Sequence, residues 1–326
     1  CIIVINGQAF KIVLNMNYLG KGGKLMHAKR RKLQYIWCWI FILPTTLFYA
    51  GFQAWPIASS VYYSTLDWSG IGSDRTFVAL DNFKELLNDQ WFWNAFANSF
   101  KYMLYSVPLL IVLSLFLAVL LNEKTLRLRS AFRTMFFLPV ITTASIVGII
   151  MMFIWSPTGA INGVLQLFGV EKSINFLGQA TLALPTVAII GVWKDVGIYM
   201  IYWLAALQSV PQDVIEAAQI DGAGKWQVFR YITLPIILPI GAVISLLAII
   251  NSLKVFDIVQ TMTAGGPFFA TDVMGTFVYR TAYASSVGMP RLGYASAAAM
   301  LFGVCIITIG FVLNTLKNIV GKHRVD

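Results

Sequence analysis

Polar side chains interrupt several long apolar segments of this chain. Charged, amide and hydroxyl groups are costly in such surroundings, so they are candidates for a functional site. The candidates are Thr143, Trp193, Lys194, Asp195, Asn251 and Ser252. Together they offer hydrogen bonds, two opposite charges and an aromatic face, which is the chemistry of reversible binding to a polar solute.

Each candidate also has a structural explanation. Lys194 and Asp195 could pair with each other or with a partner protein, although adjacent residues on a helix point about 100° apart. Asn251 and Ser252 could form hydrogen bonds that tighten the packing between helices. The sequence leaves binding and packing open for these residues.

Covalent chemistry is not indicated. The sequence shows no cluster of metal-ligating residues, and His27 and His323 stand in basic flanks. The phosphate-binding pattern G-x-x-x-x-G-K-[ST] is also missing, so this chain is not expected to bind ATP. We therefore predict no catalytic site, no metal site and no cofactor bound by this chain.

The segments that carry the polar candidates are long enough to cross a membrane. Of the 326 residues, 58% are hydrophobic and 12% are charged, and a spanning helix needs about 20 apolar residues. Six segments meet this requirement, at residues 35–63, 100–122, 134–156, 181–206, 234–256 and 294–316. Strand-like alternation is lacking. The predicted fold is therefore all-α, a polytopic membrane protein with six transmembrane helices.

The distribution of charge predicts the orientation. The net charge is +10, and Lys and Arg gather in residues 21–32, 124–133 and 317–324, whereas residues 67–89 are rich in Asp and Glu. By the positive-inside rule, both termini lie in the cytoplasm. The positive charge thus reports topology, and we predict no nucleic-acid partner. Because the sequence begins with Cys1, Met26 is a candidate natural start, and residues 1–20 are assigned no predicted structure.

The segment EAAQIDGAGKWQVFRYITLP lies between the fourth and fifth spans, in a cytoplasmic loop at residues 207–233. Pro211 suits a helix start, and Gly222 and Gly224 interrupt that helix. A second short helix follows, with Trp226 and Phe229 on one side. Two short helices joined by a glycine bend form a compact knob with aromatic anchors, which favours docking to a partner protein over an ordinary amphipathic loop.

This segment closely resembles the signature loop of permease subunits of bacterial ABC importers. The matching residues are Glu216, Ala217, Ala218, Asp221, Gly222, Ala223, Phe229, Ile232, Thr233, Leu234 and Pro235. Further blocks resemble the sugar-importing branch, namely residues 136–139, Trp193 with Gly197, and residues 263–267 with Thr271. The resemblance covers nearly everything from residue 35 onward, and the tail looks like the maltose-F-like subunit type.

The resemblance implies an ABC type I importer permease fold and a division of the chain. Residues 1–34 would form a basic cytoplasmic segment, residues 35–318 the six-helix domain with its coupling loop, and residues 319–326 a cytoplasmic tail. ATPase coupling would fall on Glu216, Ala217, Ala218, Asp221, Gly222, Ala223, Trp226 and Phe229. The chain would be a non-catalytic subunit in the bacterial cytoplasmic membrane, surrounded by lipid.

The same resemblance implies the partners. These are a second homologous permease, a cytoplasmic ATPase dimer that binds ATP and Mg, an extracytoplasmic solute-binding protein and a carbohydrate substrate. Several positions that would contact sugar in the maltose relative are apolar here, near Ala248, Val255, Val140 and Ala144, so the cargo is expected to differ.

Three alternatives stay open. The same architecture could import a non-sugar, acidic or phosphorylated solute. A secondary transporter or channel without an ATPase would predict inverted repeats with broken helices, which the sequence does not clearly show. A membrane-embedded enzyme would need the catalytic residues that are missing above.

Overall fold

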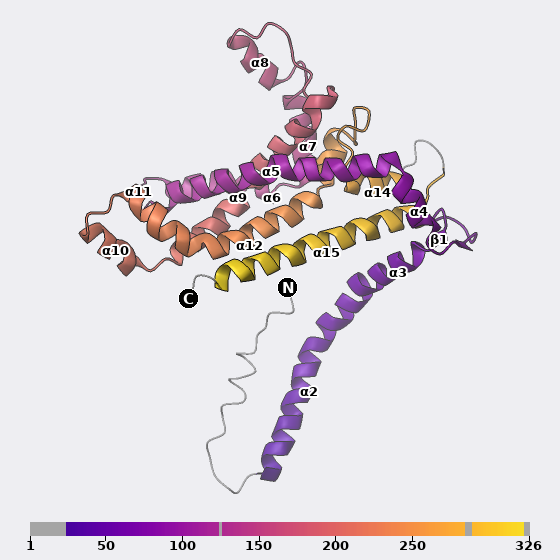
Figure 1. The fold of residues 1–326 in the computed structure, drawn as a ribbon, viewed down its shortest axis with the longest axis horizontal. Coiled ribbons are helices and arrows are strands. Elements are labelled where there is room, and N and C mark those ends of the chain that lie inside the picture. Colours follow the sequence, from indigo (N-terminus) through magenta and orange to yellow (C-terminus); the bar gives the residue numbers. More distant parts are fainter. Residues whose placement is uncertain (1–23, 124–125, 284–288, 323–326) are drawn as a thin grey trace. The chain divides into compact units, whose positions relative to one another are not determined.

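A computed structural model describes residues 24–123, 126–283 and 289–322 (Figure 1). The described chain is helical apart from its connections and one antiparallel pair of two-residue strands, β1 (Leu66–Asp67) and β2 (Thr76–Phe77). It divides into two compact units, one ending at Ser59 and one beginning at Ser60.

The first unit is a long apolar helix. It consists of α2 (Lys24–Tyr49), the π-helical turn η1 (Ala50–Ala54) and most of α3 (Trp55–Tyr63). Residues Tyr35–Tyr63 form a 29-residue candidate membrane span, and its large apolar side chains, such as Phe41, Phe52 and Trp55, are exposed. A helix with exposed apolar side chains along its length is typical of a helix surrounded by lipid.

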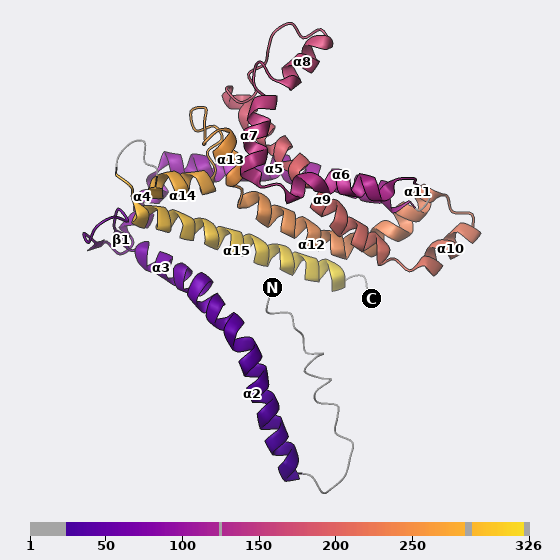
Figure 2. The ribbon, with the colours of Figure 1, turned by 180° about the vertical axis from the view of Figure 1, so that it is seen from behind.

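The second unit is built around four long helices that lie side by side (Figures 1 and 2). They are α5 (Gln90–Asn122), α9 (Ala180–Gln208), α12 (Leu234–Leu253) and α15 (Leu292–Lys322). Helix α5 packs along α9 and α12, and α15 packs along α12. Gly241 has no side chain, and the Trp203 ring lies where a Cβ would otherwise be. Small residues of this kind let membrane helices approach each other closely.

Five of the six predicted spans are single continuous helices by length and composition, whereas the third is broken. Residues 134–156 form α6 (Arg129–Ile141) and α7 (Ala144–Ile154), which are bent by 99°. The third predicted span therefore consists of two helices and is not one straight helix. The backbone is extended at Thr142 and Thr143, a conformation that β-branched residues favour.

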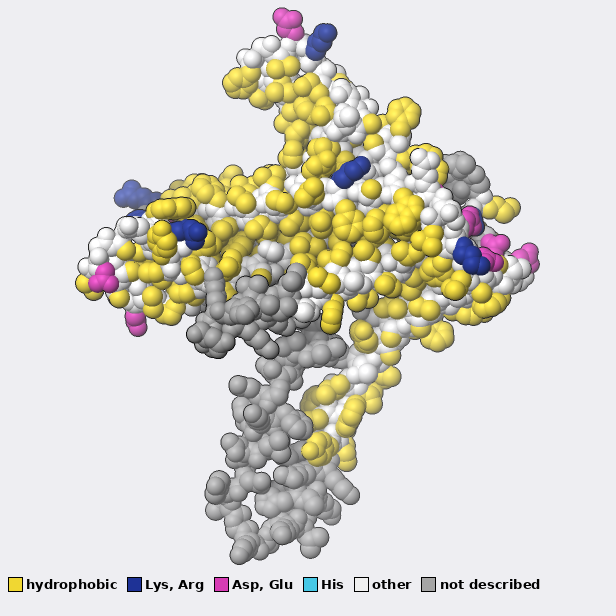
Figure 3. Space-filling model, in the orientation of Figure 1, with side chains coloured by type: hydrophobic (Ala, Val, Ile, Leu, Met, Phe, Trp, Pro, Cys, Tyr) yellow, Lys and Arg dark blue, Asp and Glu magenta, His cyan; other side chains and the backbone are white. Residues whose placement is uncertain are grey.

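Short helices stand at the two ends of this bundle. At one end, called here the α10 end, lie α10 (Gln212–Ile220), α11 (Lys225–Val228) and the π-turn η2 (Phe229–Thr233). At the other end, called the α4 end, lie α4 (Asp81–Asn88), α13 (Asp257–Met262) and α14 (Met274–Tyr283), while α8 (Ala160–Leu167) follows α7. Figure 3 shows hydrophobic side chains over the face of the bundle, with charged ones mainly towards its ends.

The α4 end is held by polar contacts between α4, α5 and α15. Both terminal guanidinium nitrogens of Arg291 donate to the Glu85 carboxylate, at 2.6 and 2.7 Å. The Tyr294 hydroxyl donates to Asp89 at 2.7 Å, and the other Asp89 oxygen accepts from the Trp91 amide, so that Asp89 caps α5. This cap separates α4 from α5.

The Glu85–Arg291 pair predicts a pH dependence. The hydrogen bond from Arg291 holds the pKa of Glu85 below its usual value of 4.5. Because the folded state then binds this proton more weakly, the pair stabilises the fold above pH 4.5 and loses that contribution as the pH falls through the lowered pKa. Both side chains are about half exposed, so the contribution is at most about 1 kcal/mol.

We expect Glu85→Gln to lower the thermal unfolding midpoint at pH 7, and we expect the difference from the wild type to shrink as the pH falls below 4.5. Unfolding followed by tryptophan fluorescence across this range measures the difference. A gap between the two proteins that stays constant with pH would contradict the assignment to this ion pair.

Candidate functional site

The predicted knob is present at the α10 end. Helix α10 ends in a turn where Gly222 has φ of +84°, a left-handed conformation that glycine adopts at little cost. The Gly222 amide donates to the Gln219 carbonyl and the Ala223 amide to the Ala218 carbonyl, so the last carbonyls of α10 are paired. This is the local reason why the chain reverses here.

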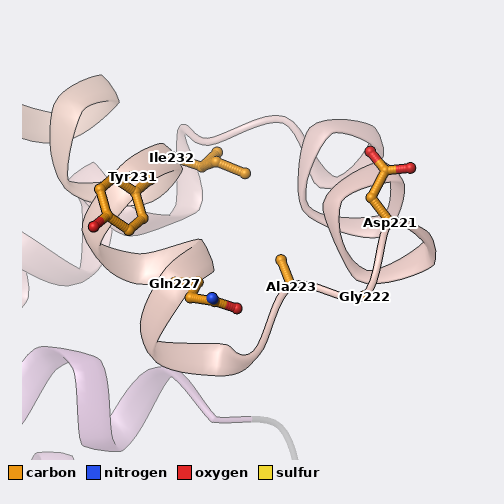
Figure 4. A pocket seen from close by; sticks show the side chains of 6 residues that line it. All are labelled: Asp221, Gly222, Ala223, Gln227, Tyr231 and Ile232. Atoms are coloured by element: carbon orange, nitrogen blue, oxygen red, sulfur yellow. The ribbon is translucent and has the colours of Figure 1, made fainter.

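The second helix of the knob begins at once. The side chain of Gln227 accepts a hydrogen bond from the Gly224 amide at 2.8 Å, which caps α11. Between the two helices lies an open pocket of about 350 Å³. It is lined by Asp221, Gly222, Ala223, Gln227, Tyr231 and Ile232. Figure 4 shows Asp221 on the α10 side and Gln227 on the α11 side.

Large apolar side chains are exposed on this knob. Ile220 is 86% exposed, Trp226 71% and Tyr231 74%. The Trp226 and Phe229 rings are tilted by 34° to each other, with 5.8 Å between their centroids. An exposed group of this kind beside a pocket is typical of a protein interface. The eight residues predicted for coupling lie on α10, on the turn after it, on α11 and at the first residue of η2.

The knob is tied to the long helices. Lys225 pairs with Glu123 at the end of α5, at 3.4 Å, and Ile215 packs against the core of α5, α9 and α12. Arg133 of α6 donates to the Leu121 carbonyl of α5 at 2.7 Å. The knob therefore contacts the end of α5, which in turn contacts α6.

The polar candidates in the bundle fall into separate places. Lys194 and Asp195 pair with each other at 3.0 Å, with side chains 14% and 46% exposed. The Asn251 amide is exposed and donates to the Tyr199 hydroxyl at 3.1 Å. Tyr199 stands one helical turn after Asp195, and the hydroxyl of the buried Tyr102 reaches α9 at Gly191, one turn before Asp195. These five residues form one polar cluster at membrane depth.

The other candidates lie elsewhere. Ser252 is buried and donates to the carbonyl of Ile249 in its own helix, while Thr143 is exposed at the bend between α6 and α7. Trp193 lines an apolar groove of about 560 Å³ between α5, α6, α7 and α9. The predicted substrate residues thus do not form one site, and their roles stay predictions.

A family model described as the inner membrane component of binding-protein-dependent transport systems matches residues 87–324. The chain belongs to this family. The predicted family is therefore confirmed, and the protein is a membrane-spanning permease that works with a binding protein. Its fold is that of an ABC importer permease.

Named relatives are similar to this permease over most of its length. The probable ABC transporter permease YurN of Bacillus subtilis (strain 168) is 33% identical over 282 residues, 86% of this permease and 94% of that protein. The lactose transport system permease LacF of Rhizobium radiobacter is 30% identical over 276 residues, 84% and 91%. A chain of the bacterial ABC transporter that imports the acidic polysaccharide alginate has a TM-score of 0.77 at 26% identity, covering 90% and 98%.

Sequence reasoning about this permease missed the tyrosines of the polar cluster. Tyr199 stands four residues after Asp195 and so lies on the same helix face, which is a usable signal. Tyr102 lies on another helix, where a close approach to Gly191 brings its hydroxyl to α9. No local pattern around Tyr102 indicates that contact.

Proposed function

We propose that this permease is the membrane subunit of an ATP-driven, binding-protein-dependent importer of sugars or oligosaccharides. Relatives carry names for lactose, for multiple sugars and for starch degradation products. The observation that carries the mechanism is the exposed knob at the α10 end, with its left-handed Gly222 and its pocket.

In this proposal the knob docks to one subunit of a cytoplasmic ATPase dimer. ATP and Mg²⁺ bind to the ATPase, and its closure pushes α10 and α11. The contacts of Lys225 and Ile215 pass that movement to α5 and its neighbours. The helices then rock between inward- and outward-open states against a second homologous permease.

The remaining partners follow from orientation. The basic segments support a position of the permease in the cytoplasmic membrane of a bacterial cell, with the α10 end and both termini in the cytoplasm. The α4 end then faces an extracytoplasmic solute-binding protein that delivers the cargo. Glu216 would face basic or backbone donor groups of the ATPase.

The polar cluster supports a neutral sugar. Asp195 offsets the charge of Lys194 at 3.0 Å, so this pair carries no net charge towards a solute. The exposed Asn251 amide and Asp195 carboxylate supply a donor and acceptors for hydroxyl groups. An acidic cargo, such as the alginate imported by the transporter of similar structure, would gain little from a lysine that is already paired.

The test is ATPase activity of the purified complex in lipid nanodiscs. We expect an ATPase to co-purify, and its activity to rise when a sugar-loaded binding protein is added. If no ATPase co-purifies, or if transport proceeds without ATP, the proposal is wrong. If an ATPase does co-purify, the same assay is repeated with binding protein loaded with different sugars and sugar phosphates. The solute that stimulates the ATPase activity identifies the cargo.

Asn251→Leu is expected to lower transport roughly two- to ten-fold, because one neutral hydrogen bond is worth about 0.5–1.5 kcal/mol. The matched control is Ser252→Ala on the next residue, whose hydroxyl is used inside its own helix and whose loss should leave transport unchanged. Uptake of labelled sugar into proteoliposomes measures both. A larger effect for Ser252→Ala would place the cargo contact on the other side of α12.

A further inference from the structure

The apolar groove between α5, α6, α7 and α9 opens on the side of the bundle. Leu109, Leu113 and Leu117 of α5 form one of its walls, at the four-residue spacing of a single helix face. Leu109 and Leu113 are exposed, and so are Met135 of α6 and Ile150 of α7 in the other walls. The groove is therefore accessible to a molecule that lies beside the bundle.

The groove is about as long as one leaflet of a bilayer is deep. One turn beyond Leu117 stands Leu121, at the end of α5, and its carbonyl accepts the hydrogen bond from Arg133. Leu109 stands twelve residues before Leu121, which is about 18 Å along a helix. One leaflet supplies about 15 Å of hydrocarbon, half of a core about 30 Å thick. From the Arg133 contact inward, the groove thus spans the depth of a single acyl chain.

The walls of the groove differ from the places where the helices of this chain meet. Gly197 lets α9 approach the α6 backbone at Phe136, and Gly241 leaves room for the Trp203 ring, as is typical of contacts between membrane helices. The described residues that line the groove include no glycine, alanine or serine, and most are Leu, Ile, Val, Met or Phe. Such a surface suits a flexible hydrocarbon chain better than it suits a helix of another protein.

Arginines stand where the groove reaches the α10 end. Arg129 and Arg133 are four residues apart on α6, and Phe136, which lines the groove, follows three residues later, so these three share one helix face. Arg129 is exposed, as is Arg127 in the turn before α6. Neither of these two pairs with an acidic side chain in the part of the chain that the structure describes. Figure 3 shows Lys and Arg side chains at this end of the bundle.

This combination of charge and apolar surface fits an anionic phospholipid. A guanidinium group binds phosphate oxygens through pairs of N–H donors, and basic pockets between membrane helices bind anionic headgroups. The hydrocarbon chain attached to such a headgroup extends into the leaflet, which is the direction of the groove from the arginines. A membrane supplies molecules that carry both parts.

We propose that one anionic phospholipid binds this permease, with its phosphate at Arg127 and Arg129 and an acyl chain in the apolar groove. The inference uses only the membrane-spanning family and does not rest on the proposed transport function. Trp193 lines the groove directly before Lys194 and Asp195 of α9. The acyl chain therefore lies against the helix that carries the polar cluster.

The experiment is photo-labelling of the full-length permease in nanodiscs of phosphatidylcholine. The probe is phosphatidylglycerol with a diazirine in one acyl chain, and the matched probe is phosphatidylcholine with the same chain. We expect phosphatidylglycerol to label residues 109–117 and 135–142 at least five-fold more than phosphatidylcholine does. Both probes should label Phe41 and Phe52 of α2 equally, because these side chains are exposed apolar groups without the groove.

Equal labelling of the groove by the two probes would mean that lipid covers it without selecting a headgroup, and it would overturn the proposal. Absence of label from the groove, with α2 labelled, would also overturn it, because another protein or nothing would then occupy the groove. Neither result would bear on the proposed transport function.

Arg129→Gln tests the contact with the headgroup. Labelling of the groove by phosphatidylglycerol should fall about five-fold, the effect of one arginine near an anionic lipid. The control is Arg230→Gln, which removes an exposed arginine of η2 at the same end of the bundle and should leave the labelling unchanged. An equal fall in both variants would mean that overall charge attracts the lipid, and it would overturn the site at α6. If Arg129→Gln cannot be purified, the comparison of the two probes on the wild type decides alone.

Discussion

Gly222→Val is expected to lower sugar-stimulated ATPase activity and transport about five- to thirty-fold, with the complex still assembled. Gly222 has φ of +84°, and a left-handed backbone costs an L residue about 1–2 kcal/mol. Each 1.4 kcal/mol is a factor of ten in population. That strain would turn α10 relative to α11, so the pocket and Trp226 would no longer face the ATPase together.

Gly72 provides a matched control. It has φ of +78° and, like Gly222, no atom within 4 Å of the position that a Cβ would take. It lies between β1 and β2, away from the knob. Gly72→Val therefore introduces the same backbone strain without disturbing α10, and it should transport as the wild type does.

Two further substitutions show whether coupling needs the left-handed bend at Gly222 or a close contact of a partner protein with this residue. Asn and Asp tolerate the left-handed conformation better than Val, so Gly222→Asn and Gly222→Asp should keep most activity if the bend alone matters. Equal loss for all three variants would mean that a partner's surface presses on this residue, because no atom of the described residues lies within 4 Å of the position that its Cβ would take. If Gly222→Val has the stimulated ATPase activity and transport of the wild type, the knob has no part in the mechanism.

Much of the architecture could be predicted because membrane insertion depends on composition. Apolar runs identified the spans, and glycine placement identified the reversal at Gly222, where the physical cause is local to a few residues. The eight coupling residues lie on one knob for the same reason. The family resemblance came from that same short segment.

The bend at Thr142 and Thr143 could not be predicted, because hydropathy reports whether a segment is apolar and not its direction. Residues 134–156 are apolar throughout, so nothing in their composition distinguishes a straight span from two helices at 99°. The polar cluster could not be predicted for another reason. The contact between Asn251 and Tyr199 joins residues 52 positions apart, and only the packing of α12 on α9 creates it.

Arg280→Met is expected to give the largest loss of stability, about 3–5 kcal/mol locally, or roughly 100- to 4,000-fold in the opening equilibrium of the loop before α14. Asp272 is 1% exposed and pairs with Arg280 at 2.7 Å, while Thr276 donates to its other oxygen at 2.7 Å. Removing the arginine leaves a buried carboxylate with one remaining side-chain donor.

Hydrogen exchange measures this opening directly. The Val273 amide donates to Thr276 and the Met274 amide to Ser99, so both amides are protected by the structure that Asp272 holds. Their exchange should accelerate in Arg280→Met. In the double variant Asp272→Leu with Arg280→Met, no charge is buried, and exchange should return most of the way to the wild-type rate.

The pH dependence of the single variant identifies the cause. Burial already raises the pKa of Asp272 in the wild type, despite Thr276 and Arg280, and loss of the arginine raises it further. A carboxyl whose folded-state pKa is raised favours the fold as the pH falls through that pKa. Arg280→Met should therefore recover protection on acidification. Rapid exchange that does not change with pH would mean that the arginine acts by packing, since its guanidinium lies 4.6 Å from the centre of the Phe269 ring.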